Sequence, residues 1–411
     1  MADVVHLPAG QLRGRRMDGV TAFVGIPYAD AERFAAPRPA AAWHGVRDAT
    51  RPGPVAPQPA SRLERIMGPD NGLEQGEDCL SLNVWTPGGT GLPVLVWLHG
   101  GGFSSGSGAE AWYDGALLAE RGDMVVVTVN YRLGALGYLY ISPEFGPANL
   151  GLLDQIAALG WVRDNIASFG GDPGRITLAG QSAGALSTIA LLHHPVGHGL
   201  FHQAILHSLP AGVPPYDTER AASIGRLLLE GLGLDAADVE QLRTVPRQRL
   251  LTAQTDVARA IAEPFAVTPP FQLVATDGVP ADLIGNPVDG GVPMLIGTTQ
   301  DEARAFFPDG PAHLTDILFR DGSLQLAGQA RSAYTFQFDW SPSTSPFNAC
   351  HCIELPFAFG ELEAWRTAPM LAEADPDDLR RLVDEVQRAW IGFVHSGSAG
   401  WERYPYVHHF A

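Results

Sequence analysis

Cysteine is scarce in this chain. Only Cys79, Cys350 and Cys352 occur among its 411 residues, and a single residue separates the last two. This number and spacing predict neither a disulfide framework nor a four-ligand zinc site. Because free thiols are typical of a reducing compartment, we expect a cytoplasmic protein.

Basic residues and long hydrophobic runs are scarce as well. The 27 Lys and Arg residues stand against 45 Asp and Glu residues, which gives a formal net charge of -18 at pH 7. Such a charge repels nucleic acids and anionic membranes, and the sequence has no compensating basic patch. No stretch reaches the roughly 18 apolar residues of a membrane helix, and the first residues, MADVVHLPAG, do not resemble a secretory signal. We therefore expect a soluble protein without a nucleic-acid or membrane partner.

The chain is long and apolar enough to bury a large core. Its 411 residues are 45% hydrophobic, and no internal repeat divides them. The Pro- and Gly-rich stretches at residues 52–60 and 341–347 have the character of loops rather than of flexible linkers. We expect one domain over residues 1–411.

Continuous apolar runs predict a buried parallel sheet. Residues 93–100 (PVLVWLHG) and 123–134 (DMVVVTVNYRLG) are apolar on both faces of a strand. Residues 152–170 and 184–194 have helical patterns, so strands and helices alternate and the helices should cover both faces of the sheet. The expected fold class is therefore α/β, with a mostly parallel central sheet flanked by helices.

Further elements are expected on either side of this region. Three more strands are indicated by short apolar runs at residues 202–208, 292–298 and 333–340. Residues 379–397 have apolar side chains at helical spacing and end at Gly397, as a closing helix would. Residues 1–60 mix short apolar runs with Gly and Pro, which predicts a small N-terminal β-hairpin region.

Ser182 is the first candidate for chemistry. It lies between two glycines in LAGQSAGALS, residues 178–187, where a strand-like run turns directly into a helical one. A serine on such a tight turn exposes its hydroxyl oxygen, as a nucleophile elbow requires. The alternative is an ordinary helix N-cap, for which serine is also a favoured residue.

Glycines after a second strand could stabilise an oxyanion. HGGGF, residues 99–103, directly follows a predicted buried strand. The backbone N–H groups of Gly101 and Gly102, together with that of Ala183 after the serine, could supply three donors. HGGGF alone would read as an ordinary glycine-rich turn, but its combination with GxSxG at a second strand end favours a catalytic site.

A carboxylate and a histidine are available to activate the serine. Asp301 and Glu302 follow a predicted strand in LIGTTQDEARAFF, and either could orient a histidine, although Asp301 could instead cap the next helix. His351 follows another predicted strand and is the strongest base candidate. The order Ser, acid, His along the chain is the order of the α/β-hydrolases.

Other histidines compete for a role. Three of them are spaced four residues apart, as metal ligands on one helix would be, namely His194, His198 and His202. A proline and two glycines within this stretch interrupt such a helix, so we expect a loop, with metal binding as the weaker alternative. His408 and His409, at the end of the sequence, are the alternative base.

Many segments between residues 22 and 360 resemble the type B carboxylesterases, a family that includes the bacterial para-nitrobenzyl esterases and is related to the cholinesterases. The resemblance extends over AFVGIPYA, WHGVRDAT, EDCLSLNVWTP, HGGGF, YDG, VVVTVNYRLGALGYL, NLGLLDQIAALGWVRDNIASFGGDP, the serine elbow, GTTQDEA and HCIELPFAFG. It implies an α/β-hydrolase fold and a serine carboxylesterase that needs no cofactor or metal and hydrolyses small-molecule esters, broadly for small or aryl groups.

The resemblance also implies roles for individual residues. Ser182 would be the nucleophile, Glu302 the acid and His351 the base. The oxyanion hole would be formed by Gly101, Gly102 and Ala183. Ser208 matches a serine that supports the acid in relatives, and Gln181 takes the place of a glutamate that precedes the nucleophile in the family.

The chain departs from the family pattern at several positions. Gln181 is neutral, so a negative charge beside the histidine is missing, while Ala303 replaces the usual glycine after the acid. Cys79 lacks the earlier cysteine with which secreted relatives form a disulfide. Glu302 and His351 are closer in sequence than in full-length members, from which we expect a more open pocket or a repositioned acid loop. The tryptophan that binds choline in cholinesterases is also missing, which argues against acetylcholine as a substrate.

Two other functions compete with the esterase. The family contains members that kept the fold and lost the triad, so a binding module is one alternative. The other is an esterase of the hormone-sensitive-lipase type, which shares HGGGF and GxSxG but takes its base from near the C-terminus, here His408 or His409. EDCLSLN and HCIELPF favour the type B family.

Overall fold

A mostly parallel sheet forms the centre of the molecule, as the apolar runs predict. The computed structural model describes residues 3–70, 72–286 and 291–411. Ten strands within these ranges form the main sheet, in the spatial order β15 (Val407–Phe410), β14 (Ala333–Phe338), β13 (Met294–Thr299), β12 (Gln203–His207), β11 (Gly171–Gln181), β9 (Leu92–Leu98), β10 (Val125–Val129), β8 (Ser81–Thr86), β4 (Thr21–Pro27) and β3 (Arg15–Arg16). The strands from β15 to β10 pair in parallel, and β8, β4 and β3 are antiparallel.

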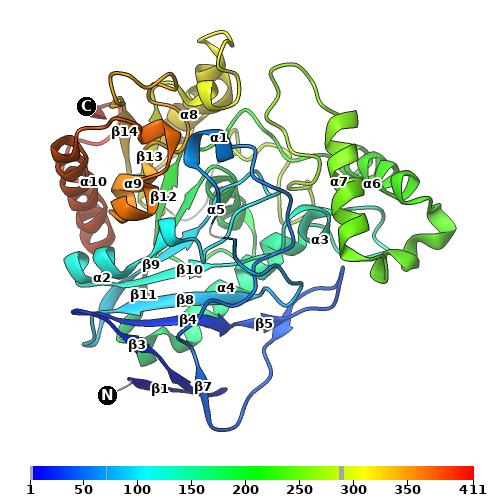
Figure 1. Cartoon of the computed structure of the whole chain (residues 1–411), viewed down its shortest axis with the longest axis horizontal. Helices are drawn as coiled ribbons and strands as arrows, with labels where there is room; N and C mark the ends of the chain where they lie inside the picture. The colour runs from blue at the N-terminus through cyan, green and yellow to red at the C-terminus, as the bar shows by residue number, and fades with distance from the viewer. Residues whose placement is uncertain (1–2, 71, 287–290) are drawn as a thin grey trace.

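The N-terminal region is built of short strands, also as expected. β1 (Val4–Leu7) and β2 (Gly10–Arg13) form a hairpin in which Leu7 is opposite Gly10. β7 (Val46–Asp48) joins this hairpin in parallel, and β5 (Ala29–Asp30) pairs with β6 (Arg38–Pro39). The hairpin lies beyond the β3 edge of the main sheet, at the bottom of Figure 1.

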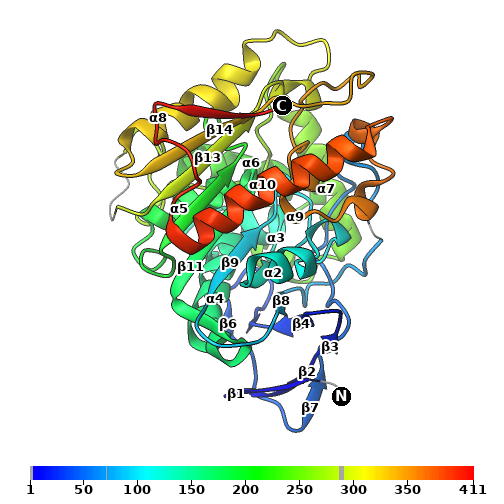
Figure 2. The ribbon, with the colours of Figure 1, turned by 90° about the vertical axis from the view of Figure 1, so that its left-hand side faces the viewer.

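Helices cover both faces of the sheet. The described helices are α1 (Glu64–Met67), α2 (Ala116–Gly122), α3 (Gly134–Tyr138), α4 (Leu150–Asn165), α5 (Ala183–His193), α6 (Thr218–Leu232), α7 (Arg247–Ala260), α8 (Asp321–Gln329), α9 (Leu355–Phe359) and α10 (Pro376–Ser396). Figure 2 shows the long helix α10 across the face of the sheet turned toward the viewer. α10 ends at Gly397, whose φ angle of 70° is left-handed, as the sequence predicts.

The side chains of β9 explain why the strand is apolar on both faces. Val94, Val96 and Leu98 belong to the core cluster that includes residues of α4 and α5. Leu95 and Trp97, which alternate with them, belong to the cluster that includes residues of α2 and α10. Because each face of the strand contacts a separate layer of helices, no position along it is free for a polar residue.

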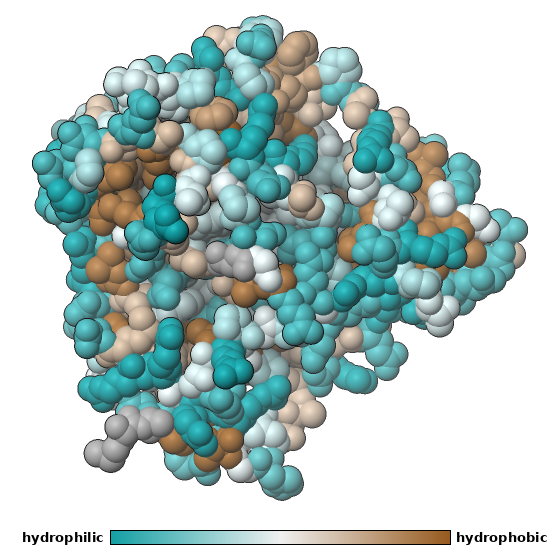
Figure 3. Space-filling view, in the orientation of Figure 1, coloured by the Kyte–Doolittle hydropathy of each residue, from teal (hydrophilic) through white to brown (hydrophobic). Residues whose placement is uncertain are grey.

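α6 and α7 form a lobe at the side of the molecule. They lie together at the right of Figure 1, away from α10 and the C-terminus. Asp217 caps the start of α6 by accepting a hydrogen bond from the Arg220 N–H, 2.6 Å away. In the view of Figure 3 most of the surface is hydrophilic, and the hydrophobic residues form separate small areas, one of them on this lobe.

A buried ion pair fixes the segment that follows β10. The Arg132 guanidinium donates to both carboxylate oxygens of Asp154 in α4, at 2.8 and 2.6 Å, and the Arg132 N–H donates to the same side chain at 3.1 Å. Arg132 also donates to the carbonyl of Ala35 at 2.8 Å. The neighbouring Tyr131 hydroxyl donates to the carbonyl of His99 at 2.6 Å, so this segment supports the start of the HGGGF loop.

None of the helices in the described ranges combines the length and the hydrophobicity that crossing a lipid bilayer requires.

Candidate active site

Ser182 occupies a strained turn between β11 and α5. Its φ and ψ angles are 54° and -118°, a conformation that residues other than glycine rarely adopt. The flanking glycines are required by close packing, since a β-carbon at Gly184 would lie 2.1 Å from the carbonyl oxygen of Leu98, and one at Gly180 would lie 2.5 Å from the backbone of Gly184. Ser182 precedes α5 but its hydroxyl makes no capping hydrogen bond. The turn therefore fits an exposed nucleophile better than a helix cap.

The HGGGF loop presents free N–H groups beside this turn. Gly101 and Gly102 have φ angles of 110° and 60°, and a β-carbon at Gly101 would lie 2.0 Å from the carbonyl oxygen of Ser105. Within the described ranges, the N–H groups of Gly101, Gly102 and Ala183 make no hydrogen bond in loops or turns. Three unpaired donors next to a serine are what an oxyanion hole requires.

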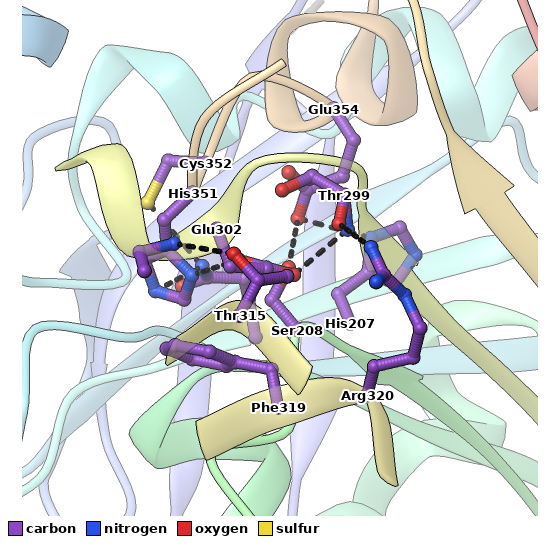
Figure 4. Close-up of polar contacts among 12 residues, drawn as sticks. His207, Ser208, Thr299, Glu302, Thr315, Phe319, Arg320, His351, Cys352 and Glu354 are labelled. Carbon is purple, nitrogen blue, oxygen red and sulfur yellow. Dashed lines mark hydrogen bonds and ion pairs between the residues drawn. The ribbon is translucent and has the colours of Figure 1, made fainter. Parts of the chain in front are cut away.

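Glu302 and His351 form a buried pair. Glu302 Oε2 accepts a hydrogen bond from His351 Nδ1 at 2.5 Å, and Glu302 Oε1 accepts one from the Thr299 N–H at 2.8 Å (Figure 4). Both side chains are fully buried. Because a carboxylate only accepts hydrogen bonds, the proton of the neutral imidazole is on Nδ1, and Nε2 carries the lone pair that a base needs.

The Gln181 side chain forms a hydrogen bond with Nε2, the second ring nitrogen of His351. The Gln181 side-chain amide donates to His351 Nε2 at 3.0 Å and also to Cys352 Sγ at 3.3 Å. In the described part of the chain, the Ser182 hydroxyl makes no hydrogen bond to His351. The amide therefore occupies the Nε2 lone pair, which a histidine acting as a general base would need.

Replacing Gln181 with glutamate is expected to move the acid side of the pH–activity profile upward by about one pH unit. A carboxylate at this position accepts hydrogen bonds only, so it favours an imidazole that is protonated on Nε2. A protonated imidazole cannot take the proton of Ser182, and a higher pH is then needed for activity. The measurement is kcat/KM against pH for a neutral ester, which reports the ionisation of the free enzyme.

Gln181→Met is the matched control, because it removes the hydrogen bond without adding charge. Its acid-side half-activity pH should stay within a few tenths of that of the unaltered protein. An unchanged profile in Gln181→Glu would contradict the contact between this side chain and the base.

Ser208 is directed to a different carboxylate from the one that the resemblance implies. Its hydroxyl donates to Glu354 Oε1 at 3.4 Å, whereas Glu302 is held by Thr299 and His351. We expected Ser208 to support Glu302, but the hydrogen bond of its hydroxyl goes to Glu354 instead. In the sequence, a role for Glu354 near the site could have been inferred from its position three residues after His351, in the same turn of the chain.

Glu354 belongs to a second buried cluster behind the site. His207 Nδ1 lies 3.3 Å from Glu354 Oε1, and the Trp390 indole N–H donates to His207 Nε2 at 3.0 Å. Since the indole can only donate, His207 Nε2 is unprotonated and the imidazole is neutral. The Ser182 N–H donates to the carbonyl of His207 at 2.9 Å, so this cluster is connected to the turn that carries Ser182.

Aromatic side chains close the space around His351. The rings of Phe306 and Phe319 lie 5.2 and 5.1 Å from the imidazole. Both line the cavity that contains Ser182, which has a volume of about 30 Å³. The cavity at Ser182 is therefore small, and a pocket more open than in full-length members stays a prediction. Phe319 comes from the shortened stretch between Glu302 and His351, which still provides a wall.

A larger cavity lies on the other side of the oxyanion loop. It has a volume of about 220 Å³, and its lining includes Gly101, Gln181, Cys352 and the aromatic rings of Trp112 and Tyr113. Ser182 lines the smaller of these two cavities and Gln181 the larger.

The cysteines beside the base are unreactive thiols. Burial raises the pKa of Cys350 and of Cys352 well above the ordinary value. Cys79 is a free thiol too, and burial raises its pKa to about 12. No group of three or more His, Cys, Asp and Glu side chains within the described ranges has the arrangement of a metal site.

The remaining candidates lie outside the site. Asp301 is half-buried beside Arg304, and its side chain makes no capping hydrogen bond. Of these two adjacent carboxylates, Glu302 is the one that contacts His351. Ala303 has the helical backbone of a short 3-10 turn, and its position needs no positive φ angle. His408 and His409 are in β15, at the edge of the sheet and four strand positions from β11.

The histidines 194, 198 and 202 lie in a turn after α5 and not on a helix, as the sequence predicts.

Comparison with known proteins identifies the family. A model of the carboxylesterase family matches residues 1–313, which include the serine elbow, the HGGGF loop and Glu302. The chain belongs to the carboxylesterase family. As a member it is a carboxylic ester hydrolase, as the resemblance of its motifs implies.

Relatives of this family match almost the whole chain. Phenmedipham hydrolase of Pseudarthrobacter oxydans is 37% identical, over 98% of this chain and 92% of its own length. Para-nitrobenzyl esterase of Bacillus subtilis is 37% identical, over 97% of this chain and 91% of its own. The solved structure of a thermophilic pNB esterase matches with a TM-score of 0.88 and 35% identity, covering 98% of this chain and 92% of that one. These matches confirm the α/β-hydrolase fold.

Proposed function

We propose that the chain is a serine carboxylesterase in which Ser182 attacks the ester carbonyl, His351 is the general base and Glu302 orients it. The observation that carries this assignment is the fully buried Glu302–His351 hydrogen bond of 2.5 Å, which leaves Nε2 as the proton acceptor beside the serine elbow. His351 then protonates the departing alcohol, and a water molecule repeats the sequence on the acyl-enzyme.

The charge that develops on the carbonyl oxygen would be stabilised by the N–H groups of Gly101, Gly102 and Ala183. Each such donor is worth on the order of 3 kcal/mol of barrier in comparable enzymes. Gly101 cannot be replaced without moving the loop, because a β-carbon there would lie 2.0 Å from the carbonyl oxygen of Ser105, and Gly102 has a left-handed φ angle of 60° that favours glycine.

We infer small or aryl esters as substrates. A cavity of about 30 Å³ at Ser182 suits a short acyl group, and the larger cavity of about 220 Å³ suits an aryl alcohol. The names of the relatives, phenmedipham hydrolase and para-nitrobenzyl esterase, fit aryl or benzyl groups. We further propose that residues 1–411 act as one domain and, from the free buried thiols, that the protein is cytoplasmic.

The test is hydrolysis of para-nitrophenyl acetate, butyrate and octanoate by the purified protein and by its Ser182→Ala and His351→Ala variants. Each variant is expected to lose at least about 1,000-fold in kcat, because removing either member of the pair disables proton transfer. The small cavity at Ser182 predicts that acetate and butyrate are hydrolysed faster than octanoate.

Controls separate this proposal from its alternatives. His198→Ala alters an exposed histidine in a turn and should keep full activity. A large loss in His408→Ala or His409→Ala, with activity retained in His351→Ala, would favour the hormone-sensitive-lipase arrangement. Three folded but equally inert proteins would favour a binding module.

A further inference from the structure

Arg62 lines the Ser182 cavity. Its guanidinium donates to the carbonyl of Val267 at 3.2 Å. It lies 5.6 Å from the centre of the Phe306 ring, and a β-carbon at Gly102 would be 3.2 Å from its Nη2. The side chain is therefore held next to the oxyanion loop, within reach of a bound acyl group.

Arg62 has no carboxylate partner. Within residues 3–70, 72–286 and 291–411, no Asp or Glu oxygen lies within ion-pair distance of its guanidinium. Two arginines that line a cavity together with Arg62 are paired, Arg220 with Glu263 at 3.5 Å and Arg259 with Asp256 at 2.8 Å. An unpaired guanidinium beside the nucleophile is unusual in a chain with a net charge of -18.

The guanidinium retains most of its hydrogen-bonding capacity. An arginine side chain has five N–H donors, and the hydrogen bond to Val267 uses one of them. The fork of the remaining N–H groups matches the two oxygens of a carboxylate. Arg62 is exposed at the surface, so an anion that binds there keeps part of its hydration.

The side chains that line the Ser182 cavity indicate which kind of substrate chain could join a group bound at Arg62 to the reacting ester carbonyl. Most of them are apolar, including Leu186, Val213, Val267, Phe306 and Phe319. Such walls favour methylene groups, and the volume of about 30 Å³ allows only a few of them. The cavity thus fits a short apolar chain whose far end reaches Arg62.

The position of the base shows which half of the ester lies there. His351 must give its proton to the leaving alcohol from Nε2, and this nitrogen faces Gln181. Gln181 lines the larger cavity, so the alcohol belongs in that cavity. The acyl group then extends into the Ser182 cavity, toward Arg62.

We propose that Arg62 binds a carboxylate at the end of a short acyl chain, so that the preferred substrates are monoesters of short dicarboxylic acids. The inference rests on the proposed esterase function. Hydrolysis breaks the single remaining ester bond and releases the dicarboxylate and the alcohol, with water supplying the hydroxyl and the proton. Arg62 acts here as a specificity residue.

Two methyl esters of equal shape test the proposal. Monomethyl glutarate carries a carboxylate at neutral pH, and monomethyl glutaramate carries an uncharged amide in its place. The ratio of their kcat/KM values, acid over amide, is expected to be about tenfold or more for the unaltered protein, as one charge-assisted hydrogen-bonded pair provides. In Arg62→Gln the ratio should fall to about one, and in Arg62→Glu the amide should become the better substrate.

Arg65→Gln is the matched control, because it removes the same charge three residues away, where the guanidinium donates to the carbonyl of Ala305. It should keep the ratio of the unaltered protein. Because each ratio is taken within one protein, a partly unfolded variant does not distort it.

Several outcomes would overturn the proposal. One is an acid-over-amide ratio near one in the unaltered protein, and another is a preference for the acid that survives Arg62→Gln. A third is an equal slowing of both glutarate esters by Arg62→Gln, which would place the guanidinium on the oxyanion instead. A preference for 4-acetoxybenzoate over 4-acetoxybenzamide that depends on Arg62 would put the carboxylate on the alcohol side and overturn the acyl assignment. A protein that hydrolyses neither glutarate ester nor para-nitrophenyl acetate would refute the esterase function, and this inference with it.

Discussion

Replacing Glu302 with glutamine is expected to lower kcat/KM for para-nitrophenyl acetate by about 10³- to 10⁴-fold, with little change in KM. A glutamine amide can donate to Nδ1 of His351, which shifts the imidazole proton to Nε2. In that tautomer the histidine has no lone pair directed at the site and cannot accept the proton of Ser182. The Thr299 N–H keeps its acceptor, since one oxygen remains, so the turn itself should persist.

Asp301→Asn is the control for this variant. Asp301 is the adjacent carboxylate, half-buried and 3.8 Å from Arg304, and it does not contact the histidine. It should keep activity within a factor of a few, and both variants should have the circular dichroism of the unaltered protein. If the Asp301 variant lost as much activity as the Glu302 variant, the assignment of the acid would be wrong.

Asp154→Ala is expected to lower the free energy of unfolding by about 3 to 5 kcal/mol. Asp154 is fully buried and accepts three hydrogen bonds from Arg132, so its removal leaves an unpaired guanidinium in the interior. The measurement is the urea unfolding curve followed by tryptophan fluorescence, with the midpoint compared at constant slope.

An exposed ion pair gives the comparison. Asp164 pairs with Arg163 at 2.7 Å, and both side chains are more than half exposed. Asp164→Ala should therefore change the free energy of unfolding by less than about 1 kcal/mol. Equal midpoints for the two variants would contradict a structural role for the buried pair.

The elements that carry the site could be predicted because their sequences leave little choice. The run of Val94 to Leu98 is apolar at every position, so it can only be a strand covered on both faces. Gly180 and Gly184 flank Ser182 because the helix packs against β9 at backbone distance. The elbow, the oxyanion loop and the alternation of strands and helices are thus local properties of the sequence.

The contacts around the base could not be predicted in this way. Gln181 and His351 are 170 positions apart, and only the folded chain shows that the amide occupies Nε2. Ser208 is close to both Glu302 and Glu354 in the fold, and its choice of the latter depends on side-chain geometry. Sequence proximity carries no information on such pairs.

The wall beside His351 also could not be predicted from the shortened interval between Glu302 and His351. Loss of residues suggests loss of a wall, but Phe319 from this interval packs against His351. Arg62 narrows the cavity from a distant part of the chain. The size of a pocket depends on which side chains fill it, and that is decided by tertiary packing.

In the proposed mechanism the two products leave from different cavities. If an acyl-enzyme forms on Ser182, the alcohol departs from the larger cavity while the acyl chain still occupies the smaller one. The emptied cavity then admits the second nucleophile along the same path. Water and any dissolved alcohol would compete for this position, so the shape of the larger cavity would influence the partition between hydrolysis and transesterification.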